Sequence, residues 1–390
     1  MIDKIKDLKN YTSELIDLRR DLHRIPEAGF KEIKTSKFIE KKLREFGLDV
    51  KTGIANTGLV GNIYSENPSS EAVMIRADMD GLPVIEKTGL DYASRHEGFM
   101  HACGHDGHMA IALIVAKILA RHRNLLKANV KFVFQPAEES PGGAKPMIDA
   151  GVLKNPDVKA LVGLHIWTRI SSGKIGIRKG PIMASVNYFK LKITGKGTHG
   201  AMPHEGVDAI VAAGKVIDSL QTIVSREINP VSPCVLTVGK INGGTAFNIL
   251  AGEVELEGTV RTLDQSLNEI IAAKIKRVIK GVTQSMGAGY KFDFKYMYPV
   301  TVNDSKITDI VCESAIEAAG AENVIEPQQT MGGDDISFYL QKVPGCYFFL
   351  GGSGSDQGLN QQLHSNLFNF DENCLPLGVE TLVKSVFKLL

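Results

Sequence analysis

The chain has 390 residues, a hydrophobic fraction of 43% and a formal net charge of +1 at pH 7. This length exceeds what a single hydrophobic core usually organises, so we expect two domains. The near-zero net charge gives no electrostatic basis for a partnership with nucleic acid or with a membrane surface, and we expect neither.

The first part of the chain alternates helical and β-rich segments. Apolar residues at helical spacing between Thr12 and Gly47 predict two helices, separated at Pro26 and Gly29. The following stretches predict a helix over His108–Arg121 and strands over Gly58–Tyr64, Ala72–Arg76, Val130–Phe134 and Leu161–Ile166. Strands that alternate with helices predict an α/β domain with a mainly parallel central sheet.

The pattern changes near Ser185. Alternating strands are predicted over Val186–Thr194, Cys234–Ile241, Glu253–Thr262 and Lys291–Tyr298, and helices over Val207–Glu227 and Leu267–Met286. This β-α-β-β-α-β order is that of a ferredoxin-like α+β unit. After Pro299 the α/β pattern returns through Asp304–Ala319, Cys346–Leu350 and Pro376–Leu390. We therefore expect a larger domain of residues 1–184 and 299–390, with the domain of residues 185–298 inserted into it.

Targeting and cysteine patterns predict a cytoplasmic protein. The N-terminal stretch MIDKIKDLKN is charged and lacks an apolar signal core. The longest apolar run, Met109–Ala120, contains Lys117 and is too short to span a bilayer. The five cysteines are scattered, odd in number and without a Cys-x-x-Cys pair, which favours a reducing compartment over a disulfide framework.

A first group of chemically capable residues, Asp78 and Asp80, follows the strand AVMIR. Two carboxylates two residues apart on an extended chain point to the same side. The alternative is an Asp-Gly turn, because Gly81 comes next.

The second group is the segment His101–His108, which contains four side chains of Cys or His type. Cysteine and histidine bind zinc-like ions, and the glycines between them let the backbone fold tightly around an ion. Asp106 would orient a ligand imidazole or cap the following helix. Two alternatives stay open: a Cys103 nucleophile activated by His105, and a buried cysteine with helix-capping neighbours.

The third group is the pair Glu138 and Glu139. Adjacent glutamates repel one another unless a cation lies nearby, and in that case one binds metal while the other holds a proton; the alternative is two solvated surface acids. His165 ends an apolar stretch, where it either hydrogen-bonds in the core or binds a ligand. His364 lies in the polar loop QQLHSNLF.

The stretches RADMDGLP, MHACGHDGH, FQPAEE, GLHIW, GKGTHGAMPH, GTVRTL, MGGDD and QLHSN occur in this order between Arg76 and Asn366. Through them the chain resembles the di-metal amidohydrolases and peptidases related to aminoacylase and carboxypeptidase G. Within that family it is most similar to the branch of hippurate hydrolases, auxin-amino acid conjugate hydrolases and N-acetyldiaminopimelate deacetylases. The resemblance implies metal-dependent hydrolysis of the amide bond of N-acyl amino acids. The alternatives are a dipeptidase or carboxypeptidase with the same metal site, and a non-catalytic metal-binding protein.

The resemblance also implies the roles of individual residues. The implied ligands of two divalent cations are Cys103, His105, Glu139, His165 and His364. Zinc suits these ligand types best, and manganese, cobalt and nickel are compatible with them. The implied catalytic and substrate-binding residues are Glu138 as general base, Asp80 as support of a metal-site residue, His199 as stabiliser of the oxyanion, and Asn248 and Arg261 as partners of the substrate carboxylate. The larger domain would be catalytic and the inserted one a dimerisation or lid domain, in a homodimer or a dimer-based oligomer.

The chain departs from the family pattern at a few positions. Asp334 stands where the family commonly has glutamate, and Gly200 where it commonly has alanine, and the stretch FNILAGEVELEG lacks a usual proline. These departures concern the fit of the substrate and leave the implied metal ligands intact. Asp335 is a candidate for a supporting role beside the metal ligands.

Overall fold

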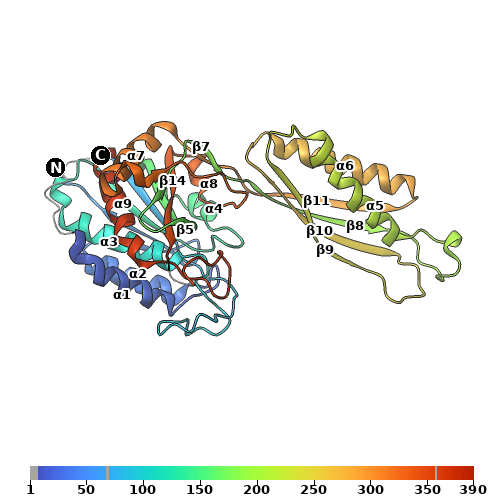
Figure 1. Ribbon diagram of the computed structural model, residues 1–390, viewed down its shortest axis with the longest axis horizontal. Coiled ribbons are helices and arrows are strands. Elements are labelled where there is room, and N and C mark those ends of the chain that lie inside the picture. The colour runs from blue at the N-terminus through green and yellow to red at the C-terminus, as the bar shows by residue number, and fades with distance from the viewer. Residues whose placement is uncertain (1–7, 67–69, 356–357) are drawn as a thin grey trace. The chain divides into compact units, whose positions relative to one another are not determined.

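The structure is a computed structural model that describes residues 8–66, 70–355 and 358–390. The chain forms two compact units. Unit 1 consists of Met1–Gly180, Val302–Gln328 and Asp334–Leu390, and unit 2 of Pro181–Thr301 and Gln329–Gly333. Each unit has its own sheet and its own helices (Figure 1). The expected combination of an α/β domain with a separate α+β domain is confirmed.

Unit 1 is built on an eight-stranded sheet with the order β1-β2-β4-β3-β5-β14-β6-β13. Its strands are β1 (Asp49–Ile54), β2 (Gly58–Ile63), β3 (Glu71–Asp78), β4 (Asn129–Gln135), β5 (Asp157–Ser171), β6 (Ile175–Gly176), β13 (Val324–Ile325) and β14 (Gly345–Ser353). The four central neighbours β4, β3, β5 and β14 run parallel, whereas β1, β2 and β6 join antiparallel. Parallel central strands with buried side chains on both faces are typical of α/β domains.

The helices of unit 1 are α1 (Thr12–His23), α2 (Ile33–Glu45), α3 (His105–Arg121), α4 (Ala144–Asp149), α7 (Ser305–Ala319), α8 (Ser337–Leu340) and α9 (Leu375–Leu389). Helix α3 is buried along nearly its whole length and contacts α1, α2 and α9 as well as β3, β4 and β5. This central position explains why its sequence is apolar on every side. It begins three residues before the predicted start, because Gly104 takes a left-handed conformation with φ +88° that glycine adopts without strain.

Unit 2 has the element order β8 (Val186–Thr194), α5 (Ala209–Thr222), β9 (Cys234–Gly243), β10 (Glu253–Thr262), α6 (Leu267–Ser285) and β11 (Gly289–Tyr298). The antiparallel sheet order is β11-β8-β10-β9, the arrangement of a ferredoxin-like unit. Alternate residues of β8 join residues of both helices in one apolar core. The chain also forms a two-stranded sheet of β7 (Gly180–Met183) and β12 (Thr301–Asn303).

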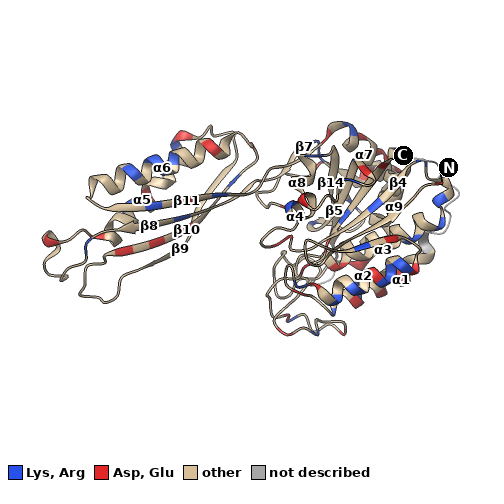
Figure 2. Ribbon diagram, turned by 180° about the vertical axis from the view of Figure 1, so that it is seen from behind, with Lys and Arg blue, Asp and Glu red and all other residues tan. Residues whose placement is uncertain are grey.

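The surface and the cysteines agree with an ordinary globular protein. Basic and acidic residues are interspersed along the helices and strands of each unit (Figure 2). All five cysteines are unpaired. Of the helices in the described part of the chain, none combines the length and the apolar character that crossing a membrane requires.

Candidate metal centre and active site

The candidate site of unit 1 lies where neighbouring parallel strands end. The last residues of β3 and β4, Asp78 and Gln135, are register partners, and Glu138 and Glu139 follow three and four residues later. His165 lies on β5, the other neighbour of β3. Carboxyl ends of parallel strands are the usual position of binding sites in α/β sheets.

The five implied ligands come together at this edge. Three overlapping groups have candidate ligand atoms within 4.8 Å of one another: Cys103 with His105 and His165, Cys103 with Glu139 and His364, and His105 with Glu138 and Glu139. The groups share Cys103, His105 and Glu139. Two adjacent positions with shared ligands are therefore available to cations.

Two of the histidines are oriented by backbone carbonyls. Nδ1 of His105 lies 2.9 Å from the carbonyl oxygen of Asp80, and Nδ1 of His165 lies 2.7 Å from that of Ile166. Since a carbonyl only accepts, both Nδ1 atoms donate and both Nε2 atoms face the site. The Nε2 of His105 is buried without a hydrogen-bond partner among the described residues, and that of His165 lies 3.5 Å from Sγ of Cys103. This is the arrangement expected of metal-binding imidazoles.

The charge balance of the site also fits a cation. Burial alone would lower the pKa of His105, but the carboxylates of Asp78 and Asp80 outweigh it and raise this pKa to about 10. The shift reports a surplus of negative charge around the ring, which a divalent cation at Nε2 would balance. The buried polar atoms and the mixed thiol, imidazole and carboxylate donors therefore fit divalent metal ions.

Glu139 and His364 form the outer side of the site. Nε2 of His364 lies 3.0 Å from Oε1 of Glu139, and the His364 side chain is 52% exposed. Burial would raise the pKa of Glu139, but His364 and His105 lower it overall. The backbone amide of His364 donates to the carbonyl of Ala102 at 2.8 Å. This bond anchors the His364 loop on the segment that carries Cys103.

Glu138 is buried, and its backbone is fixed by Asp80. The carboxylate of Asp80 accepts the amides of Glu138 and Glu139 at 2.9 and 3.0 Å. Burial, with Asp334 and Glu139 nearby, raises the pKa of Glu138 well above its ordinary value. Asp80 thus supports the site twice, through its carboxylate on the two glutamates and through its carbonyl on His105.

The other metal-capable residues of the segment His101–His108 are not members of the three groups of candidate ligand atoms described above. Both ring nitrogens of His108 are hydrogen-bonded, and His101 is buried with neither ring nitrogen paired among the described residues. Asp106 accepts from Arg19 at 2.8 Å and lies 2.7 Å from Nδ1 of His23. The sequence position of Asp106 predicts that it orients a ligand imidazole or caps α3, and both predictions are wrong. No side chain that the structure describes caps α3, and Asp106 binds Arg19 and His23 of α1 instead.

The electrostatics of Cys103 favour a metal ligand over a nucleophile. Burial, together with Glu139 and Glu138, raises the pKa of the Cys103 thiol well above its ordinary value. A nucleophilic cysteine needs the opposite shift, from a cationic neighbour or a helix N-terminus. A cation held by Cys103 would lower the pKa of its thiol and stabilise the thiolate, so the same surroundings are compatible with a ligand.

Sequence reasoning missed Arg76 as a centre of the site's support. Its guanidinium is fully buried and lies 2.7 Å from Asp78, 3.1 Å from Asp334 and 3.0 Å from Asp335. It also donates to Oε1 of Gln135 at 3.0 Å. An arginine inside an otherwise apolar strand was the available signal, because such a charge is buried only with partners. Asp335, the supporting candidate, accepts from Gln135 and from the amide of Ala144.

The three remaining candidates lie in unit 2. His199 is exposed and forms an isolated antiparallel bridge with Ile249. The neighbouring Asn248 is exposed, and its carbonyl accepts the amide of Gly200 at 2.8 Å. Arg261 on β10 is half-buried and donates to the hydroxyl of Thr259; burial lowers its pKa. The bridge holds His199 and Asn248 on adjoining segments of one unit.

The chain is similar to several known proteins over most of its length. The family model for peptidases M20/M25/M40 matches residues 74–388. An N-acyl-L-amino acid amidohydrolase from Geobacillus stearothermophilus is 42% identical over 304 residues, which cover 78% of this chain and 80% of that protein. Thermostable carboxypeptidase 1 from Saccharolobus solfataricus is 38% identical over 383 residues, covering 97% of this chain and 96% of that one. A solved structure from Bacillus subtilis, described as a dinuclear metal-binding peptidase of the M20 family, has a TM-score of 0.84 at 33% identity and covers 98% of this chain and 99% of that one.

Proposed function

Since the chain belongs to the peptidase family M20/M25/M40, as its motifs indicated, we propose that it is a metal-dependent amidohydrolase that cleaves N-acyl amino acids. The observation that carries this proposal is the convergence of Cys103, His105, Glu139, His165 and His364 beside the buried Glu138. A relative named N-acyl-L-amino acid amidohydrolase supports the substrate class. The intact set of ligands and the presence of Glu138 speak against a non-catalytic binding protein.

The proposed cofactor is a pair of divalent cations held by these five residues. A relative described as a dinuclear metal-binding peptidase supports the number of ions. Thiolate, imidazole and carboxylate donors favour zinc, with manganese, cobalt and nickel as alternatives. When bound, such ions activate water and polarise the scissile carbonyl.

The chain's own residues would handle the protons and charges of the reaction. Glu138, held by Asp80 through its backbone amide, takes the proton of the attacking water and passes it to the leaving nitrogen. His199 donates to the oxygen that becomes negatively charged. Arg261 pairs with the carboxylate on the amino acid part of the substrate, and Asn248 also binds this carboxylate.

In this proposal, residues 1–184 and 299–390 form the catalytic domain, and residues 185–298 serve dimerisation and closure over the substrate. The proposed location is the cytoplasm, supported by five unpaired cysteines.

The proposal includes a homodimer formed through β9. This strand is at the edge of the sheet of unit 2, and exposed apolar side chains lie on it and on α5: Ile210 (48%), Val211 (47%), Val235 (36%) and Ile241 (57%). An open edge with apolar neighbours is a template for pairing with a second copy. Ile241→Lys should produce monomers in light scattering, whereas Ile270→Lys on α6 should leave the oligomeric state unchanged.

The second candidate function is that of a carboxypeptidase or dipeptidase with the same metal site. A relative named thermostable carboxypeptidase supports it. The discriminating experiment compares kcat/KM for N-acetyl and N-benzoyl amino acids, including hippurate and N-acetyldiaminopimelate, with kcat/KM for dipeptides. Protein reconstituted separately with zinc, manganese, cobalt and nickel is used. Faster cleavage of dipeptides would overturn the proposed substrate class, and no cleavage with any metal would overturn the proposed activity.

A further inference from the structure

We infer that His108 is a positioning residue of the metal centre: it binds no cation itself but fixes the two imidazoles of His105 and His165. The inference rests on the metal ligands of the proposed function. It gives a role to His108, a metal-capable side chain of the segment His101–His108 that is not among the proposed ligands.

His108 is the middle of a buried chain of polar contacts. The chain starts at Arg76, whose guanidinium lies 2.7 Å from Oδ2 of Asp78. Oδ1 of Asp78 lies 2.7 Å from Nδ1 of His108, and Nε2 of His108 lies 2.9 Å from the backbone nitrogen of Ile166. A backbone amide only donates, so Nε2 of His108 is the acceptor and Nδ1 carries the hydrogen given to Asp78. Both ring nitrogens are therefore engaged, and neither has a lone pair to offer a cation.

The same chain connects the three elements that meet at the metal centre. Asp78 ends β3, His108 lies in the first turn of α3, and Ile166 directly follows His165 on β5. The His108 ring lies 5.5 Å from the His105 ring and 4.8 Å from the His165 ring, measured between centroids. It thus packs against both imidazoles while it holds the peptide next to one of them.

Helix α3 packs closely against β5 at Gly107. A Cβ placed on Gly107 would lie 2.4 Å from Cδ1 of Ile166 and 2.8 Å from the Phe370 ring. The first turn of α3 therefore lies directly on β5. The relative position of His105 and His165 depends on how this turn packs against the strand. The hydrogen bond from the backbone amide of Ile166 to Nε2 of His108 is the polar contact that fixes this packing.

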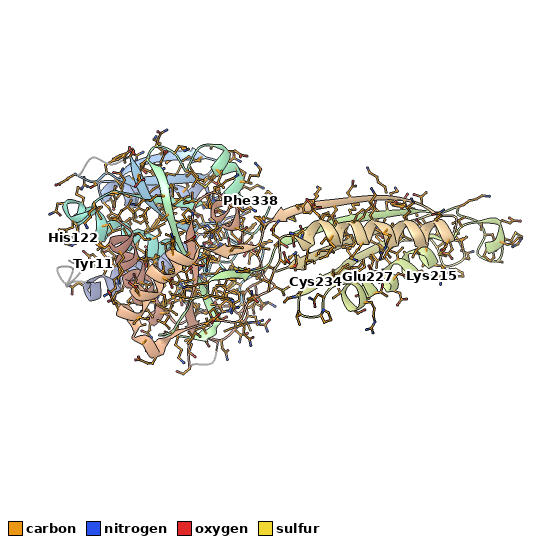
Figure 3. The ribbon with its side chains drawn as sticks, turned by 90° about the horizontal axis from the view of Figure 1, so that it is seen from above. Tyr11, His122, Lys215, Glu227, Cys234 and Phe338 are labelled. Atoms are coloured by element: carbon orange, nitrogen blue, oxygen red, sulfur yellow. The ribbon has the colours of Figure 1, made fainter. Side chains whose placement is uncertain are left out.

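The chemistry of this contact suggests an informative pair of variants. The glutamine carboxamide contains one acceptor oxygen and one donor nitrogen, so His108→Gln can accept from Ile166 and donate to Asp78. His108→Leu keeps the volume but leaves both partners unpaired, which is costly in a buried site. His122→Leu, at the C-terminal end of the same helix, is the matched control (Figure 3).

The experiment measures binding of Zn²⁺ by competition with a chromogenic chelator, and the thiolate-to-cobalt absorption band of Co²⁺-loaded protein. We expect His108→Leu to weaken binding of the metal by about 10–100-fold, the usual effect of removing a partner beyond the ligands, and to shift the cobalt band. His108→Gln should recover most of the affinity and the spectrum of the unchanged protein. His122→Leu should change neither. If His108→Leu lowers kcat, KM should stay within a few-fold, because His108 touches no substrate.

Two results would overturn the inference. The first is wild-type affinity for Zn²⁺ and an unshifted cobalt band in a folded His108→Leu protein. The second is a His108→Gln protein that folds but binds as weakly as His108→Leu, which would show that the two hydrogen bonds of His108 are not what supports metal binding. Both readouts are independent of turnover, so a failure of the proposed N-acyl amino acid activity would be seen separately, as full metal binding without cleavage.

Discussion

The candidate residues of unit 1 and of unit 2 differ in how firmly the fold holds them. In unit 1, His105, His165 and Glu138 are buried, and each is fixed by at least one hydrogen bond to the backbone or from it. In unit 2, His199 and Asn248 are exposed, and the adjacent Phe247 is fully exposed. One half of the proposed chemistry is thus preorganised within a core, and the other half lies on a surface.

The difference indicates a division of labour. A metal centre needs its donors fixed before the ion arrives, because each ligand must be oriented and freed of its proton. Groups that bind a substrate or a developing charge act only once the substrate is enclosed, so they can reside on a part that closes or on another subunit. Substitutions confined to the preorganised or to the exposed half should therefore affect metal binding and turnover differently.

The largest effect is expected from Glu138→Gln in the preorganised half. The amide retains the shape of the side chain but cannot take a proton, so kcat should fall by about 10²–10⁴-fold while the metal content is retained. Steady-state kinetics together with mass-spectrometric metal analysis provide the measurement. Glu71→Gln, an exposed position at the start of β3, is the control. Wild-type turnover by Glu138→Gln would refute the assignment of the base.

In the exposed half, His199→Ala should lower kcat by about 10²–10³-fold, the usual effect of removing one oxyanion donor. His204→Ala, a nearby exposed histidine, should leave kcat unchanged. Metal binding should be wild-type in both variants, since unit 1 contains all the proposed ligands. A fall in metal content of His199→Ala would contradict the proposed division between the units.

Mixing inactive chains sharpens this test. A His199→Ala chain has a complete metal centre, and a Glu138→Gln chain has an intact His199. If His199 acts across a subunit boundary, mixed dimers should regain activity that neither variant shows alone. If no activity returns after verified exchange of subunits, His199 acts within its own chain.

The same contrast explains what the sequence could predict. The period of apolar residues predicted the class of both domains and most of the longer strands, because each unit buries its own regular elements, but it did not predict β1, β6 and β13. The density of cysteine and histidine around Cys103 indicated a metal site. Which histidines have a free nitrogen could not be read from the sequence, because it depends on contacts such as that of His108 with Ile166, 58 residues away.

Arg76 and Asp106 illustrate the same limit. Arg76 pairs with Asp334 across 258 residues, and Asp106 pairs with Arg19 across 87 residues. Local spacing identifies a candidate for burial or capping, but the partner is selected by the packing of whole elements. For Asp106 the local pattern favoured a cap or a ligand support, and the buried guanidinium of Arg19 provided a stronger charged partner instead.

Arg261→Leu should affect substrate selection rather than the chemical step. Loss of a charge-assisted hydrogen bond of about 1.5–3 kcal/mol should lower kcat/KM for N-acyl amino acids by about 10–100-fold. The corresponding N-acyl amino acid amides, which have no carboxylate, should be hardly affected. The matched control is Arg277→Leu, which removes an arginine paired with Glu227 on the surface of unit 2; Glu227 is labelled in Figure 3. Equal losses for acids and amides would show that Arg261 does not recognise the carboxylate.

The smallest effect is expected from Glu32→Gln, a substitution in unit 1 that changes neither a proposed metal ligand nor a proposed catalytic residue. Glu32 accepts from the amide of Ala137, which precedes Glu138 and has a φ of +54°, and from the hydroxyl of Thr57 at 2.5 Å. Burial raises the pKa of Glu32 from 4.5 to about 7, against the lowering effect of Thr57. The folded state therefore binds this proton more firmly than the unfolded state does.

It follows that the contribution of Glu32 to stability is fully present below its unfolded pKa and is lost as the pH rises towards 7. Between about pH 5 and about pH 6 the loss should be at most about 1.4 kcal/mol in the free energy of unfolding. Glu32→Gln has no carboxyl to titrate, so its free energy of unfolding should fall less over this interval. Urea denaturation of the metal-free proteins measures the difference between the two slopes. Equal slopes would mean that the carboxyl of Glu32 titrates alike in the folded and unfolded states, so that the fold does not hold its proton beside Ala137.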